Sequence, residues 1–226
     1  MTPYIICEAG VNHSGNLDYA KQQIDVAAEC GASVVKFQHY DALKLLGSTS
    51  PYLEYATKCQ IGRDKHEELA KYCEHAGIPY AVSVFDVLDL EWAASLSPFI
   101  KVASRMNQDE SFIAKALTLK KPVIMSVQKM PEVIDPRIAY MFCVTNYPST
   151  EEDYAYFPYS AKFGISSHCP EADPSLKAAW AGARLFENHL ALSKEDEGCD
   201  ITSSIIPSDY GVMCRIIKAI ASNDID

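Results

Sequence analysis

The sequence has 226 residues and a formal net charge of -10 at pH 7, with 48% hydrophobic and 22% charged residues. This length suits one domain with a full hydrophobic core and lies at the lower end for an eight-stranded β/α barrel, and the composition excludes a disordered or collagen-like chain. An acidic excess repels nucleic-acid backbones and anionic membranes, so any anionic substrate must be captured by a few local cations. We therefore predict a single globular domain over residues 1–226 that has no nucleic-acid or membrane partner.

The cysteines and the amino terminus indicate the compartment. None of the eight cysteines forms a C-x-x-C pair, and most of them sit in apolar segments, which is typical of reduced and packed thiols. The amino terminus carries no basic signal region, and no apolar run approaches the roughly 18 residues of a membrane span. We expect free cysteines and a cytoplasmic location.

Short β-rich runs alternate with amphipathic stretches along the chain. Residues 4–7 form the first predicted strand, and a helix at about 17–30 ends at Gly31. Residues 33–37 form the second strand, and a long connection leads to a helix at 65–75 that ends at Gly77. Asp173 and Pro174 are predicted as the N-cap and first residue of a helix at about 173–181. The remaining strands are predicted at 80–83, 99–102, 123–126, 140–144, 163–166 and 185–187, and the remaining helices at about 89–96, 110–119 and 208–221.

Eight strands alternating with helices favour a closed (β/α)8 TIM barrel. An open doubly wound sheet is the alternative that periodicity alone does not exclude. The fifth and sixth helical units look abbreviated, because residues 129–137 contain two prolines and residues 151–160 are few and rich in tyrosine. We expect irregular chain or a partner subunit to cover the barrel there.

The predicted strands end in polar or ionisable residues, the layout of an enzyme site at the carboxyl mouth of a parallel barrel. His168 and His189 follow the last two strands and Glu8 follows the first, so two imidazoles and a carboxylate would meet in one mouth. These groups suit a divalent metal ion, whereas either histidine alone is more often a surface or core residue. We predict His168, His189 and Glu8 as metal ligands. The histidines interpreted as loop or helix-surface residues are His39, His66 and His75.

Two lysines, Lys36 and Lys101, end strands inside apolar runs. Because burying an unpaired ammonium is costly, two of them converging on one cavity indicate an anionic ligand, with an ion pair between Lys36 and Glu8 as the alternative. Hydroxyl and amide groups at strand ends would add hydrogen bonds suited to phosphate or carboxylate oxygens, unless they only fill the barrel layers. These groups belong to Ser83, Ser104, Ser126, Ser166 and Asn146.

A set of motifs runs in order from about residue 4 to residue 210. They are ICEAGVNHSG at 6–15, VVKFQ at 34–38, KVAS at 101–104, KPVIMS at 121–126, TNYP at 145–148, GISSH at 164–168, ENH at 187–189 and GCD at 198–200. Together they resemble the sialic acid synthase family, which comprises N-acetylneuraminate, legionaminate and pseudaminate synthases. The first motif is the most specific of them.

The resemblance implies a TIM barrel that condenses phosphoenolpyruvate with the open-chain aldehyde of an N-acylated amino sugar and releases phosphate. It implies a divalent ion, Mn²⁺ or else Mg²⁺ or Co²⁺, bound by His168 and His189 with Glu8 directly or through water. It also implies roles for Glu8 and Asp200 in handling protons of water and sugar hydroxyls. The implied sugar contacts are Gln38, Tyr147 and Asp200, and the implied phosphoenolpyruvate contacts are Lys36, Ser83, Lys101, Ser104, Ser126, Asn146 and Ser166.

The sugar side departs from the family pattern. Where the family usually has Gly-Glu after the serine of the fourth strand, this chain has Arg105 and Met106. Most members also continue into a small antifreeze-like domain that caps the partner's active site, and we expect no such domain within these 226 residues. Three interpretations follow: a separate protein supplies the cap, Arg105 takes over part of its role, or the acceptor is a different and smaller aldehyde.

Two other classes of function stay open. One is a different metal-dependent aldolase or hydrolase on the same barrel, and the other is a degenerate barrel that binds a sugar or a partner without turnover. Analogy with the family also implies a homodimer.

Overall fold

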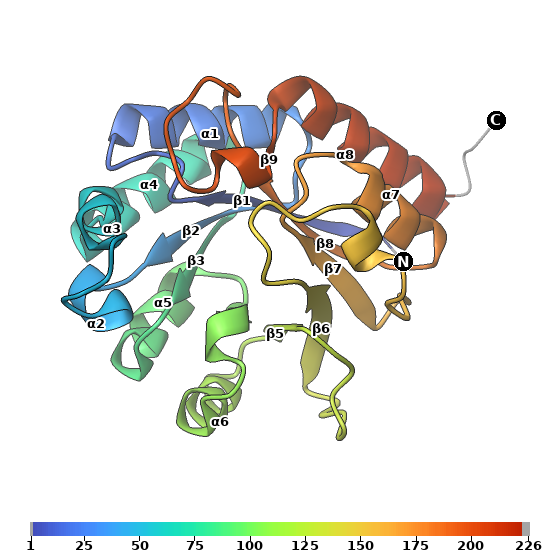
Figure 1. Cartoon of the computed structure of the whole chain (residues 1–226), viewed down its shortest axis with the longest axis horizontal. Coiled ribbons are helices and arrows are strands. Elements are labelled where there is room, and N and C mark those ends of the chain that lie inside the picture. The colour runs from blue at the N-terminus through green and yellow to red at the C-terminus, as the bar shows by residue number, and fades with distance from the viewer. Residues whose placement is uncertain (1, 223–226) are drawn as a thin grey trace.

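The computed structural model describes residues 2–222, which form a barrel of parallel strands surrounded by helices (Figure 1). Neighbouring strands pair in the order β3-β2-β1-β8-β7-β6-β5-β4, so the sheet curls round until β3 and β4 face each other across an unpaired seam. The short β9 (Ser204–Ile205) pairs with β8. The predicted (β/α)8 barrel is confirmed. The barrel strands are β1 (Tyr4–Gly10), β2 (Val34–His39), β3 (Tyr80–Val84), β4 (Ile100–Val102), β5 (Val123–Val127), β6 (Ile138–Cys143), β7 (Phe163–Ser167) and β8 (Leu185–Leu190).

Most strands are followed by a helix on the outside of the barrel. The first helix begins where the side chain of Asn16 accepts hydrogen bonds from two backbone N–H groups, and it ends before Gly31, whose φ of 79° is readily adopted only by glycine. Gly77, with φ 71°, ends α4 in the same way. The helices are α1 (Leu17–Glu29), α2 (Ala42–Leu46), α3 (Leu53–Cys59), α4 (Arg63–Ala76), α5 (Leu90–Leu96), α6 (Glu110–Thr118), α7 (Asp173–Trp180) and α8 (Pro207–Ser222).

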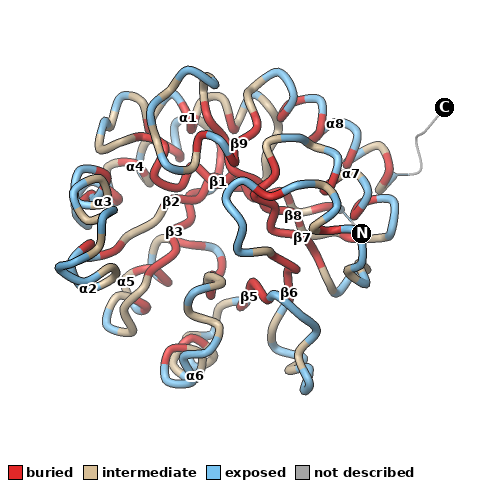
Figure 2. The backbone as a smooth tube through the Cα atoms, viewed as in Figure 1, coloured by how far each residue is buried: buried red, intermediate tan, exposed pale blue. Residues whose placement is uncertain are grey.

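Two hydrophobic clusters pack against the barrel strands, which are almost entirely buried (Figure 2), and a third, smaller one lies around Val11, Tyr40, Ala42 and Cys59. The larger cluster fills the space between the outward faces of the strands and the helices, as with Phe37, Leu69 and Phe186. The smaller cluster takes one residue from each of five strands and one from the position just before β4, so it lies inside the barrel and forms an apolar floor. Its members are Ile6, Val34, Ala81, Phe99, Ile124 and Met141.

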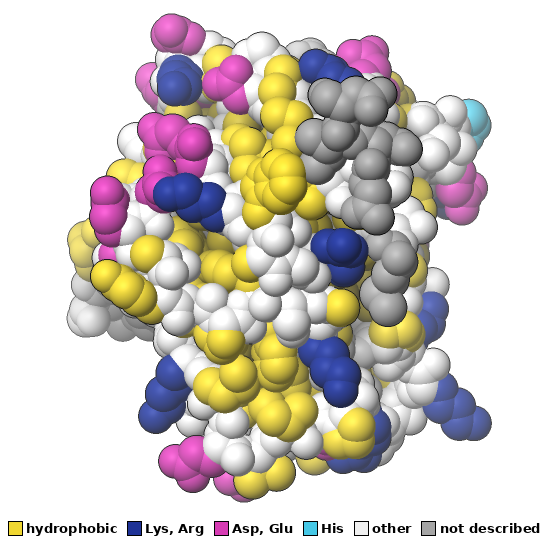
Figure 3. Space-filling view, turned by 90° about the vertical axis from the view of Figure 1, so that its right-hand side faces the viewer, with side chains coloured by type: hydrophobic (Ala, Val, Ile, Leu, Met, Phe, Trp, Pro, Cys, Tyr) yellow, Lys and Arg dark blue, Asp and Glu magenta, His cyan; other side chains and the backbone are white. Residues whose placement is uncertain are grey.

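The two abbreviated units are confirmed. Residues 128–137 after β5 are irregular, and the chain after β6 forms only a 3-10 turn, η3 (Glu152–Tyr154). Aromatic side chains cover β6 instead of a helix: the ring of Phe157 stacks on Phe142 with centroids 4.6 Å apart, and Tyr159 meets Phe142 edge-on at 6.0 Å. On the face at the right of Figure 1, hydrophobic side chains form a broken band beside lysines and arginines (Figure 3).

Two local predictions need correction. The connection after β2 contains the short helices α2 and α3, which span 5 and 7 residues and are too short to show a helical period. Asp173 is not the N-cap of α7 but its first residue, because the chain is already in the right-handed helical region at Ala172 (φ -77°, ψ -17°). Pro174 still lies in the first turn, where its missing N–H costs nothing.

All eight cysteines lie in the described part of the chain and are free thiols, as predicted. Cys199 is exposed and Cys30 is half-buried, so not every cysteine is packed in the interior. None of the helices within residues 2–222 is both long enough and apolar enough to span a bilayer.

His66 is buried and does not lie on the helix surface that the sequence predicted. Its Nδ1 lies 2.6 Å from the hydroxyl of Tyr80, and its ring meets those of His39 and Trp92 with centroids 5.1 and 5.6 Å away. The helical period of α4 could not indicate this contact, because the facing ring of His39 comes from the end of another element, β2. Burial lowers the pKa of His66 to about 3, so the imidazole is neutral in the folded protein.

We expect His66 to make folding less favourable in acid. The unfolded chain binds a proton at the ordinary pKa of about 6.5, whereas the folded chain binds it only near pH 3, so stability falls as the pH drops below about 6.5. The loss from this residue at pH 5 is on the order of 1–2 kcal/mol. Replacing His66 by Gln should therefore flatten the fall of Tm between pH 7 and pH 5, and exposed His75→Gln is the control. An unchanged slope in the His66 variant would contradict the assignment.

Candidate active site

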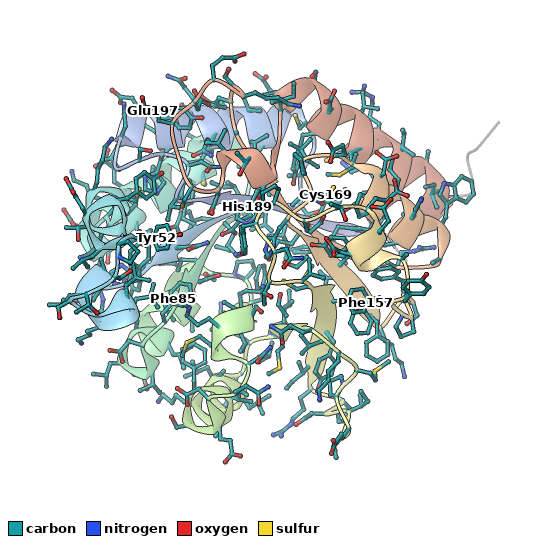
Figure 4. The ribbon with its side chains drawn as sticks, in the orientation of Figure 1. Tyr52, Phe85, Phe157, Cys169, His189 and Glu197 are labelled. Atoms are coloured by element: carbon teal, nitrogen blue, oxygen red, sulfur yellow. The ribbon has the colours of Figure 1, made fainter. Side chains whose placement is uncertain are left out.

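Strand alternation places a polar layer directly above the apolar floor of the barrel. Successive strand residues point to opposite faces, so the residue two positions after a floor residue points inward again. Ile6 is followed in this way by Glu8, and further along β8 Glu187 and His189 share the inward face; His189 lies near the barrel axis (Figure 4). The other floor residues are followed by Lys36, Ser83, Lys101, Ser126 and Cys143, all of them buried.

Lys36 on β2 is held by carboxylates from the neighbouring β1 and from β8, one strand further on. Its ammonium forms an ion pair with Glu8, lies 3.4 Å from Glu187 Oε2, and donates a hydrogen bond to Ser83 Oγ at 3.0 Å. Glu8 Oε1 also accepts a hydrogen bond from Gln38 Nε2 at 2.7 Å. The alternative of a Lys36–Glu8 ion pair is therefore present in the structure.

Lys101 on β4 reaches the same carboxylate from another strand. Its Nζ lies 3.1 Å from Glu187 Oε1 and donates to Ser126 Oγ at 2.8 Å. Ser166 on β7 donates to Glu187 Oε1, also at 2.8 Å. The structure thus brings together both predicted lysines and three of the predicted serines around one carboxylate.

Burial and opposite charge act against each other in this cluster. Burial favours a raised pKa for Glu187, but the ammonium groups of Lys101 and Lys36 outweigh it and hold the pKa well below its usual range. Burial lowers the pKa of Lys36, and Glu187 and Glu8 raise it above its usual value overall. The two lysines and the two glutamates are formally charged, and their charges sum to zero.

Glu187 is the member of this cluster that sequence reasoning did not select. It stands in the ENH motif at 187–189, but no role is predicted for it. The signal was its position two residues before His189, which places both side chains on the inward face of β8. A polar residue two positions before a predicted ligand on a strand is a candidate for the same site.

His168 is oriented by the backbone. Its Nδ1 lies 2.8 Å from the carbonyl oxygen of Val144, so Nδ1 carries the proton and donates, and Nε2 accepts from the hydroxyl of Tyr147 at 2.7 Å. The ring of Tyr147 also stacks on the imidazole with centroids 3.9 Å apart. Burial, and then the neighbouring His189, lower the pKa of His168 to about 3, so its Nε2 is unprotonated at neutral pH.

His189 completes a pair of imidazoles. Its ring centroid is 5.4 Å from that of His168, and its Nδ1 is buried without a hydrogen-bond partner, 3.6 Å from Asp200 Oδ2. Gly10 leaves room beside these groups: a Cβ there would lie 3.3 Å from Asp200 Oδ2, 3.4 Å from His189 Nδ1 and 3.5 Å from Glu8 Oε1. Polar atoms of three side chains therefore converge on the backbone of Gly10.

These donors fit a divalent ion that takes some of its ligands from water or substrate. Two imidazoles, one of them fixed by a backbone carbonyl, are ordinary metal ligands with an ordinary supporting contact. Within residues 2–222, however, no three His, Cys, Asp or Glu side chains are arranged as a complete set of metal ligands. Glu8 is engaged by Lys36 and Gln38, so the predicted three-ligand set is not preformed.

A pocket of about 710 Å³ opens above this layer at the carboxyl mouth. Part of its wall comes from the chain between β2 and α4 and from the residue that follows β3, with Tyr52 and Phe85 among the lining residues (Figure 4). Arg105 also lines it and donates to the carbonyl oxygen of Leu45 at 3.1 Å. The predicted residues that line it are Gln38, Ser104, Tyr147, His168 and Asp200.

The remaining predicted residue is not brought to the site: Asn146 is exposed on the loop after β6 and does not line the pocket. Ser104 lines it but accepts a hydrogen bond from Gln128, an internal partner that the sequence did not predict. A second cavity, of about 520 Å³, lies at the amino ends of the strands, lined by Tyr4, Val123 and Leu185 among others. Barrel enzymes place their chemistry at the carboxyl mouth, so the 710 Å³ pocket is the candidate substrate site.

Known synthases of sialic and legionaminic acids are similar to this chain over most of its length. The N-acetylneuraminate-9-phosphate synthase of Homo sapiens is 27% identical over 96% of this chain and 70% of its own length, and that of Drosophila melanogaster is 30% identical over 95% and 67%. The N,N'-diacetyllegionaminic acid synthase of Campylobacter jejuni is 26% identical over 96% of this chain and 75% of its own length.

A solved structure shares the fold, and a family model matches the sequence. The N-acetylneuraminic acid synthetase of Leptospira borgpetersenii, solved with citrate, superposes with a TM-score of 0.88 over 100% of this chain and 86% of its own, at 22% identity. The model of the NeuB family matches residues 23–224. The resemblance to sialic acid synthases is thereby confirmed, and the chain belongs to the NeuB family of enzymes.

Proposed function

We propose that the protein condenses phosphoenolpyruvate with the open-chain aldehyde of an N-acylated amino sugar, forming a nonulosonic acid and releasing phosphate. The observation that carries the proposal is the pair of buried ammonium groups, Lys36 and Lys101, each bound to a strand-end serine beneath the pocket. Two buried cations at the carboxyl mouth suit a small ligand with more than one anionic group. The relatives named as synthases of sialic and legionaminic acids support the same reaction class.

Phosphoenolpyruvate carries a phosphate and a carboxylate, and the cluster offers donors for both. The ammonium groups of Lys36 and Lys101 and the hydroxyls of Ser83 and Ser126 come from four neighbouring strands, β2 to β5. Fixing both anionic groups of the enol orients its C3 toward a second substrate in the pocket. The enol carbon then attacks the aldehyde carbon, water adds at C2, and phosphate leaves from the resulting tetrahedral centre.

The pocket supports an acceptor with both apolar and polar groups. Tyr52 and Phe85 provide apolar surface for an acyl methyl group, whereas Gln38 and Asp200 offer hydrogen bonds to hydroxyls. A pocket of about 710 Å³ has room for both substrates together. Arg105 adds a cation at the rim, which favours an acceptor whose far end is polar or anionic.

His168 and His189 would hold a divalent ion, with Mn²⁺ proposed and Mg²⁺ or Co²⁺ as alternatives. When bound, such an ion supplies Lewis acidity for polarising a carbonyl oxygen. The protein's own contribution is a fixed His168 tautomer, set by the hydrogen bond from Nδ1 to the carbonyl oxygen of Val144. Glu8 and Asp200 both approach Gly10 and are our candidates for accepting protons from water and from a sugar hydroxyl.

The test is phosphate release from phosphoenolpyruvate with Mn²⁺ and a panel of aldehydes headed by N-acetylmannosamine and the 2,4-diacetamido hexoses. We expect release with one sugar, and we expect a chelator to stop it. If no aldehyde of the panel gives phosphate release and phosphoenolpyruvate does not bind, a degenerate barrel is favoured. Metal binding without binding of phosphoenolpyruvate would favour a different metal-dependent aldolase or hydrolase.

A further inference from the structure

Glu187 bridges two lysines that come from separate strands. Its Oε1 lies 3.1 Å from Lys101 Nζ and its Oε2 lies 3.4 Å from Lys36 Nζ, and the residue is only 5% exposed. Within residues 2–222 it is the carboxylate that forms ion pairs with both lysines. Ser166 holds Oε1 in place by a hydrogen bond of 2.8 Å. The carboxylate therefore occupies the position between the two ammonium groups that an anionic ligand would share.

The charge balance of the cluster affects how readily an anion can bind there. The formal charges of Lys36, Lys101, Glu8 and Glu187 cancel, so a buried anion entering this cluster would add uncompensated negative charge. Like charges repel strongly away from bulk water, and Glu187 is the carboxylate that contacts both cations, whereas Glu8 pairs with Lys36 alone. Glu187 therefore opposes the binding of any small anion, while it also keeps the two ammonium groups in place.

We propose that Glu187 is a positioning residue that neutralises Lys36 and Lys101 in the absence of an anion and so sets the anion affinity of the site. The proposal rests on the proposed function, because the lysines are taken as the phosphoenolpyruvate contacts. Removing the charge of Glu187 should strengthen the binding of inorganic phosphate and slow turnover, since the lysines then lose their common anchor. A merely structural role would weaken both.

The experiment compares the parent with Glu187→Gln, in which the side chain keeps its size and one acceptor oxygen. Binding of inorganic phosphate is measured by calorimetry in the presence of a chelator, and turnover of phosphoenolpyruvate is measured with Mn²⁺. We expect phosphate to bind about tenfold more tightly and kcat to fall by about tenfold or more. The control is Glu132→Gln, which removes the same charge from an exposed loop. Unchanged or weaker phosphate binding in a folded Glu187→Gln variant overturns the proposal.

A second comparison covers the case in which Glu187→Gln does not fold. The double variant Lys101→Met with Glu187→Gln removes one charge of each sign, so the cluster stays balanced. It should bind phosphate about tenfold more tightly than Lys101→Met alone, and equal binding overturns the proposal.

The two proposals fail in different ways. If the parent does not bind phosphoenolpyruvate, the proposed function fails. If the parent binds it and the Glu187 variants bind phosphate no more tightly than their references, only the role of Glu187 fails.

Discussion

Replacing Lys101 by Met is expected to weaken phosphoenolpyruvate binding by roughly 30-fold or more, because loss of one partner from a buried charge pair costs about 2–5 kcal/mol. The substitution removes the ammonium that contacts Glu187 and Ser126, and it leaves the cluster with a net negative charge that repels the ligand. Lys36 still contacts Glu187 at 3.4 Å and Ser166 still donates to it, so the barrel should remain folded. Calorimetry with phosphoenolpyruvate, and separately with the acceptor sugar, measures the effect.

The control for this prediction is Lys71→Met, which removes a lysine from the exposed face of α4. It should bind both substrates as the parent does. Acceptor binding should change far less than phosphoenolpyruvate binding in the Lys101 variant. Equal affinity of the Lys101 variant and the parent for phosphoenolpyruvate would remove Lys101 from the anion site.

Replacing His168 by Ala should abolish metal-dependent turnover. The imidazole of this residue is neutral, is held in one tautomer by Val144, and lies with its ring centroid 5.4 Å from that of His189. Removing one of two imidazole ligands should lower Mn²⁺ affinity by more than about 100-fold, because loss of a supporting contact alone costs about 10–100-fold. Mn²⁺ binding and phosphate release are measured on the same preparations.

His75→Ala is the matched control for His168, because it removes an exposed histidine from α4. It should keep both metal affinity and turnover. Parental phosphate release by the His168 variant would exclude the metal assignment. Parental Mn²⁺ binding without turnover would instead place His168 in the chemistry but not in the metal site.

The strand ends show how far the sequence could predict the site. Short apolar runs that end in Lys36, Ser83, Lys101, Ser126 and Ser166 placed those residues at one mouth of a barrel, and the structure finds them buried there. This prediction depends only on the period of two residues along a strand and on the parallel order of the strands. Both are local or topological properties.

Contacts across the barrel could not be predicted in this way. The sequence suggested Lys36 with Glu8, which are adjacent partners on β1 and β2, but it did not suggest Lys101 with Glu187, which lie on strands that are not neighbours in the sheet. The wall around Tyr52 was missed because α2 and α3 are too short to show a period.

By itself the sequence determined the order of strands and helices, the alternation that turns Glu8, Lys36 and Lys101 inward, and the end of the barrel that holds the chemistry. Only the tertiary structure decided which inward groups meet, as when Glu187 joins two lysines and Tyr147 covers His168. The physical reason is the distance along the chain over which each property is set. Backbone geometry repeats every two residues and is encoded locally, whereas contacts across the barrel depend on how all its strands are staggered around the axis.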